Sequence, residues 1–198
     1  QMDADAATRR AGASALAGML NAMNELPKPL IARCHGNAFG GGVGMLSVCD
    51  VAIGAEGAKF GLTETRLGLI PATIGPYVVA RMGEARARRV FMSARIFDAA
   101  EAKDLDLLAR VVPASDLDAA VEAEVVPYLQ VAPRAVAAAK SLARALGPRI
   151  DPEVIEMTID RLVVENRAGS ANLAETQAFM DDGKRVLVFS DAGGTGRS

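Results

Sequence analysis

The 198-residue sequence has no tryptophan, only two tyrosines and an aromatic content of 4%. Proteins that hold single-stranded nucleic acid stack its bases on aromatic side chains, so this composition argues against that class. The 22 basic and 24 acidic residues leave a net charge of -2. That balance offers no basic surface to a nucleic-acid backbone or an anionic membrane. We therefore expect no nucleic-acid partner and no membrane partner.

Cysteine and histidine are equally scarce. Cys34, Cys49 and the single His35 are too few for a structural zinc site of the usual kind. We expect two small buried thiols in a reducing compartment, and no bound metal. Residues 1–5 lack the apolar core of a signal peptide, and no run of about 18 apolar residues could span a membrane. The sequence thus predicts a cytoplasmic protein.

Hydrophobic residues make up 51% of the chain, which suffices for a sizeable core. Apolar residues at three- and four-residue steps predict a first helix over residues 1–26. Up to about residue 113, short strands expected at 30–33, 51–55, 59–61 and 110–113 alternate with helices at 42–49, 77–81, 84–92 and 99–104. After that only helices are expected, at 116–130, 133–146, 152–168 and 171–182, before a disordered tail. This order predicts an α/β core over 1–113 and a helical region over 114–198.

The stretch from Lys28 to Asp50 reads as an apolar strand, a turn with glycines at 40, 41 and 42, and a helix. Such a turn brings backbone N–H groups close to a ligand, and the helix N-terminus favours negative charge. A dinucleotide fingerprint fails because position 45 is methionine, and a P-loop fails because its Gly-Lys-Ser/Thr is absent. An oxyanion site is therefore favoured over a phosphate site, with a purely structural turn as the alternative.

Glu64 is the candidate proton carrier. It follows a predicted strand and lies between Leu62 and Leu67. A carboxyl group in apolar surroundings has a raised pKa and can transfer protons near neutral pH. The alternative is a glutamate that begins a helix or pairs with Arg66.

Four segments in this order and spacing resemble the enoyl-CoA hydratase/isomerase (crotonase) superfamily. They are Lys28-Pro-Leu-Ile-Ala, His35-Gly-Asn-Ala-Phe-Gly-Gly-Gly, Cys49-Asp-Val-Ala and Phe60-Gly-Leu-Thr-Glu-Thr-Arg-Leu-Gly-Leu-Ile-Pro. The resemblance extends from about residue 16 to about residue 184. Residues 69–78 are most similar to bacterial methylglutaconyl-CoA hydratase-like members.

The resemblance implies a spiral core of ββα turns and a C-terminal helical region that forms a homotrimer, often a dimer of trimers. It also implies further ββα turns upstream, with an Ala-Gly-Ala-Asp-like loop that gives a second oxyanion N–H. Residues 1–26 correspond to the helix after that loop. We therefore expect the upstream part of the core to be missing from this sequence, and the alternative is a protein that lacks half of its oxyanion hole.

The resemblance further implies an acyl-CoA substrate, so that coenzyme A arrives as a thioester and no separate cofactor is needed. Gly41 matches an oxyanion N–H donor, and Glu64 matches a general acid/base. Contacts with the substrate are expected from Ala38, Phe39, Gly40 and Pro71. Near the C-terminus, Phe179 matches a residue that meets the coenzyme A of a neighbouring subunit. The lysine that usually follows it is replaced by Asp182, and Lys184 is expected to substitute.

Position 44 departs from the family pattern. Hydratases of the family often carry a first glutamate there, and this chain has Gly44. We expect a hydratase of a 2-enoyl-CoA, methylglutaconyl-CoA among the candidates, that works with Glu64 alone. One alternative is a 3-enoyl-CoA to 2-enoyl-CoA isomerase, which needs only one base. Another is a CoA-binding or assembly protein without turnover.

Three polar positions complete the expectations. Asp50 is expected to anchor the turn between helix and strand by hydrogen bonds. Asp98 is expected to cap the helix that follows it. Arg81 is expected to be solvated or salt-bridged, unless it recognises a second carboxylate of the substrate.

Overall fold

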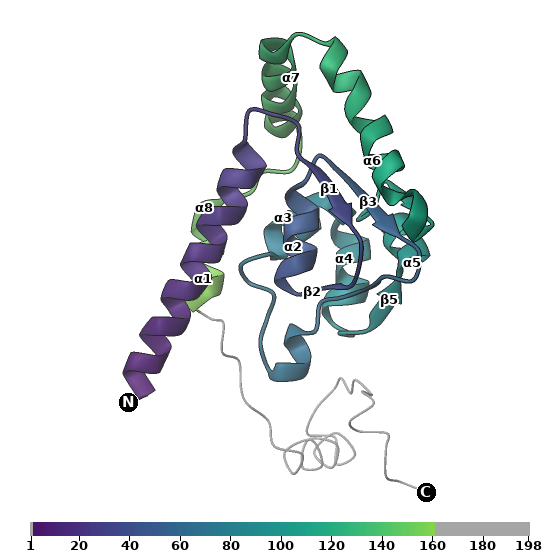
Figure 1. Cartoon of the computed structure of the whole chain (residues 1–198). Helices are drawn as coiled ribbons and strands as arrows, with labels where there is room; N and C mark the ends of the chain where they lie inside the picture. The colour runs from purple at the N-terminus through teal and green to yellow at the C-terminus, as the bar shows by residue number, and fades with distance from the viewer. Residues whose placement is uncertain (1, 161–198) are drawn as a thin grey trace, which may run out of the picture.

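The computed structural model describes residues 2–160, and they form an α/β fold with a long helix along one side (Figure 1). That helix, α1 (Met2–Glu25), confirms the predicted first helix. It ends just before Pro27 and Pro29, whose missing N–H groups cannot continue a helix. Its buried residues Ala17 and Leu20 contribute to the main core.

Two small sheets form the centre of the fold. The first contains β1 (Ile31–Cys34), β3 (Val51–Ala55) and β6 (Arg110–Val112), all parallel, in the order β1-β3-β6. The second contains β2 (Ala38–Phe39), β4 (Lys59–Gly61) and β5 (Ile96–Asp98). In it β2 is parallel to β4, and β5 is antiparallel to β4. The predicted α/β class is confirmed, although β2 and β5 were not predicted.

Short helices connect and cover these sheets. They are α2 (Gly41–Val48), α3 (Gly75–Met82), α4 (Glu84–Phe91) and α5 (Ala99–Asp104). Figure 1 shows α2 and α3 side by side between α1 and β1. As predicted, the Asp98 side chain caps α5, because its Oδ1 accepts a 2.9 Å hydrogen bond from the Glu101 N–H.

The C-terminal part of the described chain is helical, as predicted. It contains α6 (Leu117–Val125), α7 (Pro133–Leu146) and α8 (Pro152–Asp160), and α8 lies beside α1 (Figure 1). The continuous helix predicted over 116–130 is wrong, because its last turn is a 3₁₀ segment, Val126–Gln130. Pro127 explains the change, since its nitrogen cannot donate to the carbonyl four residues earlier. The helix predicted over 171–182, the end of the one over 152–168 and the predicted tail lie outside the described residues.

A polar contact joins α7 to the core. The Lys140 ammonium donates to Asp50 Oδ2 at 2.7 Å and to the Lys28 carbonyl at 3.1 Å. The same Asp50 oxygen accepts the Leu30 N–H at 2.7 Å. Asp50 is thus the hydrogen-bonding anchor that the sequence predicted. It also forms an ion pair with Lys140 of the helical region.

Replacing Lys140 with methionine is expected to lower the free energy of unfolding by about 1.5–3 kcal/mol, the usual range for hydrogen bonds to charged groups. The Lys140 side chain is only 11% exposed, so solvent screens its pair with Asp50 little. Arg144→Met on the same helix is the matched control. Arg144 pairs with Glu25 at 3.1 Å, but both side chains are well exposed, and such pairs contribute about 1 kcal/mol or less. Urea denaturation of the three proteins measures the difference, and equal losses from the two variants would contradict the expectation.

Candidate active site

The carboxyl ends of β2 and β4 meet at one place in the second sheet. These strands are parallel, with Ala38 opposite Phe60 and Phe39 opposite Gly61. The glycine turn directly follows β2, and Glu64 comes three residues after β4 ends. The topology therefore brings the two predicted parts of the site together, because parallel strands deliver their following loops to the same edge.

Gly40 shapes the turn that leads into α2. Its backbone has φ 48° and ψ -115°, which side-chain-bearing residues rarely adopt. Its N–H donates to the Gly61 carbonyl at 2.9 Å, which fixes the turn to the end of β4. Helix α2 then begins at Gly41, whose N–H has no acceptor within its own helix. This N–H lies at the positive end of the helix and can stabilise a negative oxygen.

Glu64 lies directly against this turn. A Cβ built on Gly40 would lie 3.0 Å from Glu64 Oε1, so a side chain at position 40 would push the carboxylate slightly out of its present position. The other oxygen, Oε2, is buried and has no hydrogen-bond partner among the residues that the structure describes. Buried polar atoms are nearly always paired in native proteins. An unpaired carboxylate oxygen beside a glycine turn is therefore a candidate contact for a ligand or a reacting proton.

The protonation of Glu64 is shifted by its surroundings. Burial raises the pKa of its carboxyl group, and a hydrogen bond from its own backbone N–H partly opposes the rise. Burial has this effect because a low-dielectric environment disfavours the charged form. A carboxyl group of raised pKa can both accept and donate a proton near neutral pH, which is the property that general acid/base catalysis requires.

Glu64→Gln is expected to raise the melting temperature increasingly as the pH rises. Because the native pKa of Glu64 lies above its unfolded value, the native state binds the extra proton between the two values, and stability falls as the pH rises through that window. Glutamine carries no charge and avoids this loss. Melting curves from about pH 4 to pH 8 should therefore diverge above the usual carboxyl pKa of about 4.3. Parallel curves would show that Glu64 is not desolvated in the native state.

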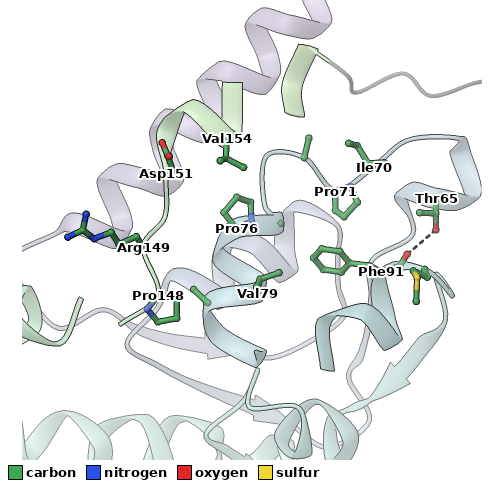
Figure 2. A pocket seen from close by; sticks show the side chains of 14 residues that line it. Thr65, Ile70, Pro71, Pro76, Val79, Phe91, Pro148, Arg149, Asp151 and Val154 are labelled. Atoms are coloured by element: carbon green, nitrogen blue, oxygen red, sulfur yellow. Dashed lines mark hydrogen bonds between the residues drawn. The ribbon is translucent and has the colours of Figure 1, made fainter. Parts of the chain in front are cut away.

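A pocket of about 540 Å³ opens between α3, α4 and the segment that connects α7 to α8 (Figure 2). Its walls are mainly apolar, with Pro71, Pro76, Val79 and Phe91 prominent, and Arg149 and Asp151 belong to the connecting segment. Thr65 also lines it, and its hydroxyl donates to the Phe91 carbonyl at 3.3 Å. Glu64 and Gly41 do not line this pocket, so it adjoins the candidate site without containing its polar groups.

The remaining predicted contact residues divide into two groups. Ala38 and Phe39 form β2, and Phe39 is 41% exposed. Pro71 lies in the loop before α3 and lines the apolar pocket. The structure thus places Ala38, Phe39 and Gly40 at the end of β2, and Pro71 on the neighbouring pocket. Phe179 and Lys184 lie outside the described residues.

Several other predicted side chains have structural partners. Arg81 donates to the backbone carbonyls of Cys49 at 2.9 Å and Asp106 at 3.0 Å, so its guanidinium joins two turns. Cys34 and Cys49 are buried free thiols, as predicted, and they donate to the carbonyls of Gly36 and Met45, each at 3.2 Å. Burial raises the pKa of both thiols. His35 directly follows β1 and is exposed.

Over residues 2–160, no three or more His, Cys, Asp and Glu side chains are grouped as a metal site would need. No helix in the same range is both long and apolar enough to cross a membrane.

Comparison with known proteins agrees with the resemblance. The model of the family described as enoyl-CoA hydratase/isomerase matches residues 3–180. A probable enoyl-CoA hydratase of Mycobacterium tuberculosis is 44% identical over 90 residues, which are 45% of this chain and 35% of that protein. Rat mitochondrial methylglutaconyl-CoA hydratase is 38% identical over 100 residues, which are 50% of this chain and 32% of that protein. The aligned part is thus about a third of these relatives' length.

Solved structures agree as well. An enoyl-CoA hydratase from Mycobacterium avium superposes with a TM-score of 0.74 at 28% identity. The superposition covers 91% of this chain and 70% of that one.

Proposed function

The chain belongs to the enoyl-CoA hydratase/isomerase (crotonase) superfamily, and from this premise we propose that it adds water to the double bond of a 2-enoyl-CoA thioester. Glu64 is the general acid/base of this reaction, and the Gly41 N–H is an oxyanion donor. The coenzyme A thioester is the substrate, so the reaction needs no separate cofactor.

One observation carries the proposal. The Glu64 carboxylate lies against the glycine turn, with Oε2 buried and unpaired within the described part of the chain. The proposed proton carrier thereby contacts Gly40, the residue that directly precedes the first N–H of α2. Proton transfer at the carbon beside a thioester carbonyl requires these two functions together, because the carbonyl oxygen gains negative charge as the proton moves.

The proposed reaction has two steps. Water attacks C3 of the enoyl group while Glu64 takes one of its protons, and the thioester oxygen becomes an enolate stabilised by the Gly41 N–H. The enolate then reforms the carbonyl as Glu64 returns the proton to C2. The product is a 3-hydroxyacyl-CoA, which contains the substrate plus one water, and Glu64 ends in its starting state.

The runner-up is the isomerisation of a 3-enoyl-CoA to a 2-enoyl-CoA, which the glycine at position 44 favours. Here Glu64 removes a proton from C2, the Gly41 N–H stabilises the resulting dienolate, and Glu64 returns the proton to C4. A single base suffices, since the same proton leaves one carbon and joins another.

Methylglutaconyl-CoA is the first specific substrate to test, because a rat relative carries that activity in its name. Its acyl group has a second carboxylate that a cation could recognise. Arg81 already donates to two backbone carbonyls, so it is engaged elsewhere. Arg66, exposed in the 3₁₀ helix that Glu64 begins, is the arginine we propose for this contact.

Absorbance assays with crotonyl-CoA, a 3-enoyl-CoA and methylglutaconyl-CoA test the proposal. Loss of the enoyl thioester absorbance with crotonyl-CoA or methylglutaconyl-CoA supports a hydratase. Appearance of a 2-enoyl thioester from the 3-enoyl-CoA supports an isomerase. If none reacts while coenzyme A still binds, the protein is the third alternative, a CoA-binding or assembly protein, and the proposed enzyme is wrong.

We also propose that the chain forms the homotrimer, or dimer of trimers, typical of its family. Large apolar side chains are exposed in the helical region, with Leu129 at 78%, Leu142 at 60% and Leu146 at 80%. Sedimentation equilibrium measures the subunit number directly.

A further inference from the structure

Gly44 is in tighter contact with a neighbouring side chain than any residue with a Cβ could be. A Cβ built on it would lie 2.4 Å from Ile74 Cγ2 and 2.8 Å from Ile74 Cβ. Real Cβ atoms do not approach other atoms this closely, so Ile74 occupies the space in which a side chain at position 44 would begin. Ile74 is 2% exposed and lies in the turn that enters α3. Its backbone is joined to α3, because the Val78 N–H donates to its carbonyl at 3.0 Å.

The direction of that missing side chain matters for the site. Gly44 lies one helical turn after Gly40, and its N–H donates to the Gly40 carbonyl at 3.1 Å. Side chains on a helix lean toward its N-terminus and over the preceding turn. A long side chain at position 44 would therefore extend toward the glycine turn and toward Glu64, whose carboxylate adjoins Gly40.

We propose that Ile74 is a specificity-determining residue that keeps this active site to a single carboxylate. By filling the space beside Gly44, it excludes a second acid from the glycine turn, and Glu64 alone must both take and return the proton. This inference rests on the proposed function, and it assigns to Ile74 the choice between one-acid and two-acid chemistry.

The surroundings of Glu64 agree with a single acid. Burial and its own backbone N–H account for the shift in its pKa, and no charged residue is among the causes. No described side chain hydrogen-bonds to its buried oxygen. The proton that Glu64 gains from water or from C2 thus has no second described carboxyl group to receive it. It stays on Glu64 until it is delivered to carbon.

The contact itself is tested by a double-mutant cycle. Gly44→Ala is expected to lower the melting temperature, because its Cβ meets both Cγ2 and Cβ of Ile74. Ile74→Gly removes both atoms and lowers the melting temperature by leaving a cavity. Gly44→Ala combined with Ile74→Gly should lower the melting temperature by less than the sum of the two single losses, because the second change makes room for the first. Additive losses would overturn the proposed exclusion by Ile74.

The chemical consequence is tested by placing a second acid in the enlarged space. The test variant is Gly44→Glu with Ile74→Gly, and the matched control, Gly44→Gln with Ile74→Gly, has the same size without the charge. We expect one ionisation in the acid limb of kcat/KM for wild type and control, and two for the test variant. Identical pH profiles for the two double variants would contradict the proposal.

A readout independent of turnover separates this inference from the proposed function. Carbon NMR titration of the glutamate carboxyl groups should show the pKa of Glu64 higher in the glutamate variant than in the glutamine control, because like charges disfavour ionisation. Absence of turnover in wild type would refute the proposed function but leave this shift to be observed. An unshifted Glu64 would refute the inference even if wild type is active.

Discussion

Glu64→Gln is expected to lower kcat on the preferred enoyl-CoA by about 10²–10⁴-fold, the usual contribution of a positioned general acid/base. Glutamine keeps the size and the hydrogen-bonding capacity of the side chain, but it cannot accept a proton from water or return one to carbon. Because Glu64 Oε2 has no described partner, the change breaks no hydrogen bond to that oxygen. Steady-state kinetics measure the loss, and circular dichroism with melting curves checks that the fold is retained.

Glu56→Gln is the matched control for that experiment. Glu56 is exposed in the turn after β3, and the same chemical change there should leave kcat within about twofold. If Glu64→Gln retained activity as the Glu56 variant does, Glu64 would not be the proton carrier, and the site would have to be reassigned.

Gly41→Pro is expected to lower kcat by about 10²–10³-fold, because it removes the N–H proposed to stabilise the enolate. The backbone tolerates the change. Proline is favoured at the first position of a helix, which Gly41 occupies in α2. The preceding residue, Gly40, has ψ -115°, outside the α region that a following proline disfavours, and as a glycine it adopts its positive φ of 48° freely.

Gly41→Ala separates the lost N–H from any steric effect. A Cβ on Gly41 would meet only Leu16 Cδ2, at 3.8 Å, which is an ordinary contact. The alanine variant keeps its N–H and should therefore keep most of its activity. Equal kcat values for the proline and alanine variants would show that the Gly41 N–H does not act in the reaction.

The sequence predicted the elements that carry a strong local pattern. The apolar repeat of α1, the Asp98 cap of α5 and the buried strand β3 were all visible in the residues themselves. The short strands β2 and β5 were not visible, because both are defined by their pairing with β4. Their pairing with β4 depends on residues far apart in the chain.

The site was predicted as two separate pieces. Glycine spacing and an apolar-flanked glutamate indicated an oxyanion turn and a proton carrier, but nothing local showed that Glu64 would contact Gly40. That contact arises from the parallel pairing of β2 with β4. The role of Ile74 was also missed, because its contact with Gly44 joins residues thirty positions apart. An isoleucine in a loop sequence gives no sign that it fills the space beside Gly44.

Product analysis after incubation with a 2-enoyl-CoA in D₂O tests the central claim most directly, since it follows the proton that Glu64 is proposed to move. The account predicts a 3-hydroxyacyl-CoA with one deuterium at C2, formed by wild type and almost absent with Glu64→Gln. Unchanged thioester after incubation with wild type, or the same deuterated product formed at the same rate by the variant, would contradict it.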